Sequence, residues 1–185
     1  MARTQRFWAA DLLHVWFDAF GAADWFGGSD AVDTLLRHRF ERWILALSGQ
    51  PPDRFLGDSQ TALAAVLLFD QLPRNLYRGT SHAFAYDSLA RAITHGALQR
   101  GYLSTLASDT QRQFLAMPLM HSERIADQRL SLEIFRELGP RHGWAFARSH
   151  YMMVARFGRY PHRNKVLGRK STPAEDRAIA AGFSW

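Results

Sequence analysis

The sequence has no cysteine among its 185 residues. Disulfides, zinc–thiolate sites, iron–sulfur clusters and thiol nucleophiles are therefore excluded. Two further motifs are missing: a complete Gly-x-x-x-x-Gly-Lys-Ser phosphate loop and a Gly-x-Ser-x-Gly nucleophile elbow. Long apolar runs are absent too, because the longest uninterrupted one covers residues 62–69, far less than a membrane span. We therefore expect no membrane partner, and the sequence indicates no cofactor.

The N-terminus lacks the pattern of a targeting signal. Its apolar stretch is interrupted by Asp11, His14 and Asp18. Hydrophobic residues make up 47% of the chain and aromatic residues 13%, which is enough to build a core. A chain of this length and composition predicts one globular domain spanning residues 1–185, in a cytoplasmic protein.

Acidic residues are missing from a long window, residues 138–174, although the net charge of the chain is only +6. The window holds eight basic residues: Arg141, Arg148, Arg156, Arg159, Arg163, Lys165, Arg169 and Lys170. Two interpretations stay open. The block could attract nucleic acid, an anionic membrane or a small anion. Alternatively, its arginines could pair with carboxylates elsewhere in the fold, such as Asp70 or Glu123.

The apolar periodicity is helical throughout, and no strand-length alternation occurs. We expect helices over residues 7–20, 30–48, 58–72, 81–96, 108–118, 122–138, 143–156 and from 172 onward. Pro73 is expected to end the third helix, and Pro118 to end or kink the fifth. The start signals include Ser108 with Gln111 and Thr172 with Glu175, which are capping boxes. The sequence therefore predicts an all-α domain of seven to eight helices arranged in antiparallel pairs.

Polar residues concentrate in three segments, residues 69–80, 118–128 and 156–172. The first and third echo each other, since each has a Phe, a Pro four residues on, and then an Arg-Asn pair. We expect these two segments to meet in space. The candidate ligand-binding residues are Asp70, Arg74, Asn75, Arg78, His121, Glu123, Asp127, Arg159, His162, Arg163, Asn164 and Arg169.

These segments also carry a resemblance to a known family. Residues 68–75 (Leu-Phe-Asp-Gln-Leu-Pro-Arg-Asn), 119–123 (Leu-Met-His-Ser-Glu) and 157–164 (Phe-Gly-Arg-Tyr-Pro-His-Arg-Asn) resemble signature blocks of an uncharacterised bacterial family, Domain of Unknown Function nine-twenty-four. The resemblance extends from about Phe7 to Phe183, with Leu72 and Tyr160 as small departures. It implies an all-helical fold like that of tetratricopeptide-repeat proteins, an α-α superhelix, and it implies no activity.

The residue types in these segments suit binding of an anion. An arginine fork binds two oxygens of a phosphate or carboxylate at once. The nearby carboxylates could orient the arginines or act as acid and base, and His121 beside Glu123 would suit proton transfer near neutral pH. The same groups could instead form a structural network that satisfies the carbonyls at helix ends. Glu123 and Asp127, four residues apart, are expected to share one helix face.

Three functions follow from this pattern. The first is a helical-repeat-like binding module with an Arg/Asn/His-lined cleft for a small anionic ligand or peptide. The second is an enzyme with an Arg/His/carboxylate pocket that acts on a phosphorylated or carboxylated metabolite. The third, nucleic-acid binding through residues 138–174, is disfavoured because Gly, Pro, His and Asn interrupt the basic residues. A metal is also disfavoured, because His121 and Glu123 lie two residues apart rather than three or four.

Overall fold

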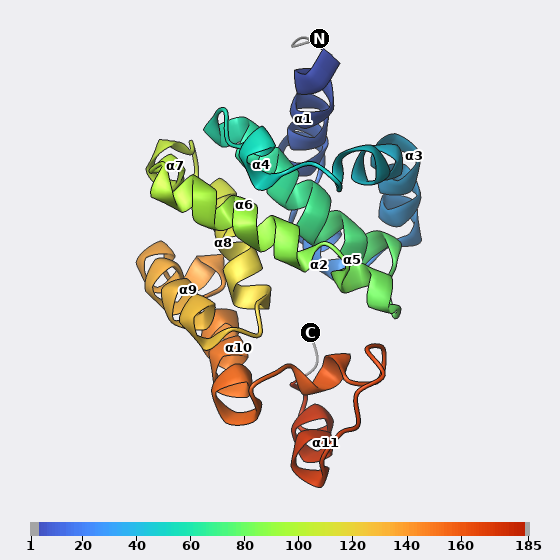
Figure 1. Ribbon diagram of the computed structural model, residues 1–185, viewed down its shortest axis with the longest axis vertical. Helices are drawn as coiled ribbons and strands as arrows, with labels where there is room; N and C mark the ends of the chain where they lie inside the picture. The colour runs from blue at the N-terminus through green and yellow to red at the C-terminus, as the bar shows by residue number, and fades with distance from the viewer. Residues whose placement is uncertain (1–3, 184–185) are drawn as a thin grey trace.

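The computed structural model describes residues 4–183, and within that range every regular element is helical (Figure 1). The α-helices are α1 (Thr4–His14), α2 (Ala22–Gly27), α3 (Asp30–Leu47), α4 (Ser59–Val66), α5 (Leu72–Leu76), α6 (Asp87–Gln99), α7 (Tyr102–Thr105), α8 (Asp109–His121), α9 (Ile125–Leu138), α10 (Trp144–Phe157) and α11 (Pro173–Ala180). The predicted all-α class is confirmed. Eight of these helices have eight or more residues, and the short α2, α5 and α7 are additional to the prediction.

The most apolar segment lies at the centre of the main core, as its composition predicted. Residues 62–69 are completely buried. Asp58 begins α4 by accepting a hydrogen bond from the backbone N–H of Thr61 at 2.8 Å. Around α4 pack α1, α6 and α8, so this helix fixes the positions of the segments that follow it. No helix within the described range is long and apolar enough to cross a bilayer.

Pro73 does not end the third helix, contrary to the prediction. The chain passes from α4 through a π-helical turn, Leu67–Gln71, directly into α5. Proline in a regular helix clashes with the carbonyl four residues earlier and cannot donate to it. A π turn carries one extra residue and widens the helix at that point. Pro73 is therefore accommodated near the start of α5, and Asp70 and Arg74 stay on one continuous helical segment.

The fourth predicted helix begins later and ends later than expected. A 3₁₀ turn, Ser81–Phe84, comes first, and α6 then runs from Asp87 past Gly96 to Gln99. Gly96 lies inside this helix, at a point where α6 and the side chain of Leu56 approach each other closely. A Cβ at this position would overlap Cδ1 of Leu56, a buried side chain. The position of Gly96 thus reflects packing and not a helix end.

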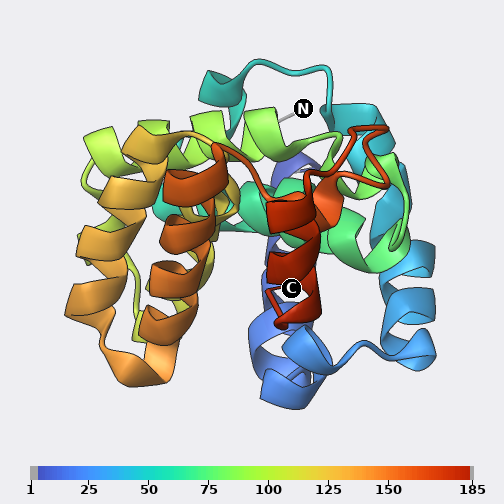
Figure 2. The same ribbon diagram turned by 90° about the horizontal axis from the view of Figure 1, so that it is seen from below.

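Helices α8, α9 and α10 follow one another along the chain, and α9 packs against both α8 and α10 (Figures 1 and 2). Ser108 caps α8 by accepting from the N–H of Gln111, while the Gln111 side chain bonds the N–H of Ala107 and not that of Ser108. Pro118 lies inside α8, which continues to His121.

After α10 the chain returns toward α6 and ends in α11 at the lower edge of Figure 1. The predicted capping box at the start of α11 is confirmed. Thr172 accepts from the N–H of Glu175, and the Glu175 carboxylate accepts from the N–H of Thr172. Met153, Val154, Tyr160 and Ala178 form a small second apolar cluster beneath this segment.

Candidate functional site

A fully buried carboxylate, Asp70, lies in the π turn between α4 and α5. Its oxygens are 2.8 and 2.9 Å from Nδ1 of His121 and 3.1 Å from a guanidinium nitrogen of Arg74. Burial alone raises the pKa of a carboxyl group, but Arg74 and His121 more than offset it and lower the pKa of Asp70 to about 2. Asp70 is therefore ionised, and Nδ1 of His121 is the donor.

Two arginines from distant segments share a second carboxylate. Arg74 in α5 donates to Oδ2 of Asp87 at 3.0 Å, and Arg163 donates to the same oxygen at 3.2 Å. Asp87 is the first residue of α6. The expected meeting of segments 69–80 and 156–172 is therefore confirmed, and the equivalent arginines of the two echoing motifs converge on one oxygen atom.

The Arg163 guanidinium is held between two aromatic rings. Its central carbon is 4.5 Å from the ring centre of Phe84 and 4.6 Å from that of Tyr160, a cation–π geometry. The side chain is only 7% exposed, and its buried Nε has no hydrogen-bond partner within the described range. Burial, helped by the positive charge of Arg74, lowers the pKa of Arg163 from its usual value.

Three histidines and a tyrosine lie in a row beside these ion pairs. The ring centres of His121 and His150 are 6.2 Å apart, those of His150 and Tyr160 are 5.4 Å apart, and those of Tyr160 and His162 are 5.6 Å apart. Burial lowers the pKa of His121, although Asp70 opposes the shift. Burial also lowers the pKa of His150 to about 3 and that of His162 to about 4. All three are neutral at pH 7.

We call the group at the middle of this arrangement the arginine–histidine centre. It comprises Asp70, Arg74, Asp87, His121, His150, Tyr160 and Arg163. Two guanidinium groups face two carboxylates there, so its charges balance while the histidines are neutral.

Tyr160 joins the centre to the end of α8. Its hydroxyl donates to the carbonyl of Met120 and accepts from the side-chain amide of Gln128 at 2.7 Å. Gln128 is fully buried and also donates to the carbonyl of Ser122 at 2.6 Å. Burial raises the pKa of Tyr160, so the phenol stays protonated. These bonds satisfy carbonyls that the end of α8 leaves without helical partners.

Glu123 and Asp127 do not share one helix face, contrary to the prediction. Since α9 begins at Ile125, Glu123 lies in the turn before it. Glu123 accepts two hydrogen bonds from Arg169, at 2.8 and 2.9 Å, and one from the N–H of Tyr160. Burial raises the pKa of Glu123, but the hydrogen bonds from Arg169 outweigh it and lower the pKa. This pair fixes the backbone of the segment that carries Arg163.

Asp127 belongs to a neighbouring set of polar groups. It accepts from Oγ of Ser122 and from Nε2 of His95, both at 2.7 Å, and lies 3.5 Å from a guanidinium nitrogen of Arg91. Asp127 is nearly buried, since only 6% of its side chain is exposed.

Other candidates lie outside the centre. Arg78 pairs with Asp33 on the surface, where 54% of the arginine side chain is exposed. Arg159 makes two hydrogen bonds to Glu175. Asn164 is buried and donates to Ser171, whereas its counterpart in the first motif, Asn75, is half-buried. Arg159, Arg163 and Arg169 therefore pair with carboxylates, which confirms the second interpretation of the basic block for these residues.

Sequence reasoning missed Asp87, His150 and Phe84. Because a helix was expected to start near residue 81, Asp87 was placed in the helix interior, where an acidic residue gives no sign of a site. Had α6 been placed correctly, Asp87 would have stood out as an acidic residue at a helix start. His150 lies outside the three polar segments of the sequence, yet it is 6% exposed and contacts both Tyr160 and His121.

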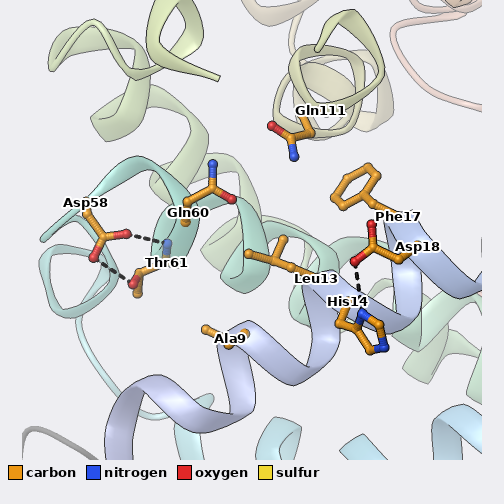
Figure 3. A pocket seen from close by; sticks show the side chains of 10 residues that line it. Ala9, Leu13, His14, Phe17, Asp18, Asp58, Gln60, Thr61 and Gln111 are labelled. Atoms are coloured by element: carbon orange, nitrogen blue, oxygen red, sulfur yellow. Dashed lines mark hydrogen bonds and ion pairs between the residues drawn. The ribbon is translucent and has the colours of Figure 1, made fainter. Parts of the chain in front are cut away.

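A pocket of about 500 Å³ lies elsewhere, between α1, α4 and α8 (Figure 3). None of the candidate residues from the sequence lines it. Its carboxylates are already engaged, since Asp58 caps α4 and Asp18 bonds the exposed His14 at 2.9 Å. Titratable groups whose pKa values are shifted by burial and charged neighbours are candidates for a functional site, so we place the candidate site at the arginine–histidine centre. No three carboxylate or imidazole groups of the described chain converge to hold a metal ion.

The fold and this centre define an all-helical protein with a buried histidine–carboxylate–arginine network. Residues 12–182 match the model of a family described as "Bacterial protein of unknown function (DUF924)", and the chain belongs to that family. It is similar to the solved structure of a protein of unknown function, ATU0120 from Agrobacterium tumefaciens, with a TM-score of 0.88 and 37% sequence identity over 94% of this chain and 97% of that one. No curated protein matches the chain.

Proposed function

We propose that the arginine–histidine centre binds a small carboxylate- or phosphate-bearing molecule. The observation that carries the proposal is the convergence of Arg74 and Arg163 on Asp87 beside the Asp70–His121 pair. A guanidinium fork suits two oxygens of one anionic group. The side chains of Arg74 and Asp87 remain 19% and 24% exposed, so an anion can reach the centre from this side.

Charge balance gives this binding a pH dependence. The centre is neutral while its histidines are unprotonated, and an added anion leaves it with excess negative charge. His121 is the nearest group that can take up a proton, since its Nδ1 already donates to Asp70. We expect anion binding to raise the pKa of His121, so that affinity increases as the pH falls from 8 to 6.

The experiment is calorimetric titration with inorganic phosphate and with butyrate at pH 8, 7 and 6, alongside thermal shifts. We expect binding to wild type and a loss of about tenfold or more in Arg163→Gln, equivalent to about 1.4 kcal/mol. Arg78→Gln is the matched control, because Arg78 pairs with a carboxylate on the surface away from the centre. Equal affinities in wild type and Arg163→Gln contradict the proposal.

A specific observation favours a second candidate, proton-transfer catalysis. Because Asp70 holds the Nδ1–H of His121, the unprotonated nitrogen of the imidazole is Nε2, and no residue of the described chain bonds it. A carboxylate that orients a neutral histidine in this way makes it a general base. Such a site would act on a carboxylated or phosphorylated metabolite held by Arg74 and Arg163.

This candidate is tested by following proton exchange of pyruvate in D₂O, and hydrolysis of glycerol phosphate, by NMR. If His121 is the base, His121→Asn lowers the rate by about 10²-fold or more. His38→Asn, a change at an exposed histidine, leaves the rate unchanged. Exchange and hydrolysis at the buffer rate in wild type remove catalysis on these two substrates and leave the binding proposal standing.

We further infer a superhelical arrangement of the tetratricopeptide-repeat type, supported by the packing of α9 against both α8 and α10. Nucleic acid is disfavoured as the partner, because Arg159 and Arg169 pair with carboxylates and Arg163 is only 7% exposed, too buried to contact a polymer backbone, whereas a small anion can approach it beside Arg74.

A further inference from the structure

Three polar residues lie at successive turns along one face of α6. Asp87, Arg91 and His95 are spaced four residues apart, so they lie above one another on the helix. Asp87 belongs to the arginine–histidine centre, and His95 bonds Asp127 at 2.7 Å. Their side chains are 24%, 26% and 34% exposed. A partly open polar row therefore continues from the centre along α6.

Arg91, the arginine of this row, is less engaged than the arginines of the neighbouring ion pairs. Its guanidinium is 3.5 Å from Asp127, within ion-pair range, but no residue of the described chain makes a hydrogen bond with it. Asp127 already accepts two shorter bonds, from Ser122 and His95. In contrast, Arg74, Arg163 and Arg169 all donate hydrogen bonds to carboxylates. The donors of Arg91 are thus free to take oxygens of a ligand.

We propose that the molecule bound at the arginine–histidine centre carries a second anionic group and that Arg91 binds it. This inference rests on the proposed function, because the first anionic group occupies Arg74 and Arg163. Side chains four residues apart on a helix have Cβ atoms about 5–6 Å apart. Asp87, which accepts from Arg74 and Arg163, lies one turn before Arg91 on α6, so the ligand class is a short dicarboxylate, or a carboxylic acid with a phosphate a few bonds away.

The pair of succinate and butyrate tests this directly, since the two acids have equal chain length and differ in one carboxylate. Calorimetry on wild-type protein is expected to show succinate binding about tenfold more tightly than butyrate. In Arg91→Gln the affinity for succinate falls to that for butyrate, while the affinity for butyrate is unchanged. Arg91→Lys keeps the charge and retains part of the preference.

Arg100→Gln is the matched control. Arg100 directly follows α6 and forms one ion pair at 3.2 Å, with the exposed Asp53, away from the polar row. It is expected to keep the full succinate preference. Circular dichroism and the melting temperature confirm that the variants are folded.

The outcomes separate this inference from the proposed function. If wild type shows no succinate preference, or Arg91→Gln keeps it, the second contact is wrong, while binding of butyrate that depends on Arg163 still supports the proposed function. If neither acid nor phosphate binds wild type, both proposals fail.

Discussion

Nδ1 of His121 lies 2.8 Å from Oδ1 of Asp70, and this bond joins the end of α8 to the π turn after α4. It fixes the tautomer of the imidazole, because an ionised carboxylate can only accept. The same Oδ1 lies 3.1 Å from a guanidinium nitrogen of Arg74, so Asp70 contacts both side chains. The properties of the centre therefore depend on one buried carboxylate.

Asp70→Asn should be strongly destabilising. The substitution removes the charge that compensates buried Arg74, and breaking a buried pair in this way costs about 3–5 kcal/mol. Urea unfolding at pH 7 measures the change. Asp33→Asn, at the exposed pair with Arg78, is the control and should cost less than about 1 kcal/mol. A loss of similar size in both variants would show that water screens Asp70.

Acid should destabilise the protein through its buried histidines. In the folded state their pKa values are lowered from 6.5, to about 3 for His150 and to about 4 for His162. The histidines of the unfolded chain therefore bind protons at a higher pH than those of the folded protein. This stability is fully present above pH 6.5 and is lost as the pH falls toward the folded values. Each histidine that stays neutral contributes a slope of about 1.4 kcal/mol per pH unit.

Urea unfolding between pH 7 and 4.5 checks this pH dependence. His150→Phe, which fills the site with an uncharged ring, should make the slope shallower. His38→Phe, at an exposed position, should leave it as in wild type. An unchanged slope in His150→Phe would mean that His150 is protonated in the folded protein.

Gly96→Ala should destabilise the protein although alanine favours helix. The added methyl group overlaps Cδ1 of Leu56, and such overpacking costs about 1–3 kcal/mol, against a gain of about 1 kcal/mol in helix propensity. In a Leu56→Ala background the clash is gone, and the same substitution should be stabilising. A double-mutant cycle by urea unfolding measures the change of sign, and its absence would show that Leu56 moves aside freely.

Thr172→Ala should loosen α11. The hydroxyl accepts the N–H of Glu175, and loss of such a cap costs about 1 kcal/mol. Hydrogen exchange of the α11 amides should become faster, while exchange in α4 stays the same. Thr105→Ala is the control, because the Thr105 hydroxyl caps no helix start and bonds only the carbonyl of Tyr102. Faster exchange throughout the chain would instead indicate that α11 unfolds together with the core.

Local signals in the sequence were sufficient for most of the fold. Asp58, Ser108 and Thr172 all cap helices at the expected positions, because capping depends on side chains within three residues. The proline at position 73 misled the prediction, since a π turn depends on the packing of its neighbours and has no local signature. The start of α6 was missed for a related reason, because a 3₁₀ turn occupies the expected first turn.

The candidate site was predicted in part. The echo between the two Arg-Asn motifs correctly brought Arg74 and Arg163 together. The carboxylate between them, Asp87, could not be predicted, because it comes from a third segment without a motif. Arg78 was assigned to the site because it is only four residues from Arg74 in the sequence. In the structure it lies at the surface and pairs with Asp33.

The π turn at Leu67–Gln71 makes the length of this segment a constraint of its own. The turn, which contains Asp70 and precedes Arg74, holds one residue more than a regular helix needs. Deleting a single residue there would restore a regular helix and rotate everything after it by about 100°, the angle that one residue spans at 3.6 residues per turn. Helix α4 would still fit the core in the shortened chain, but the carboxylate of Asp70 and the guanidinium of Arg74 would face away from His121 and Asp87. Relatives that share the centre are therefore expected to vary in side chains here and never in the number of residues.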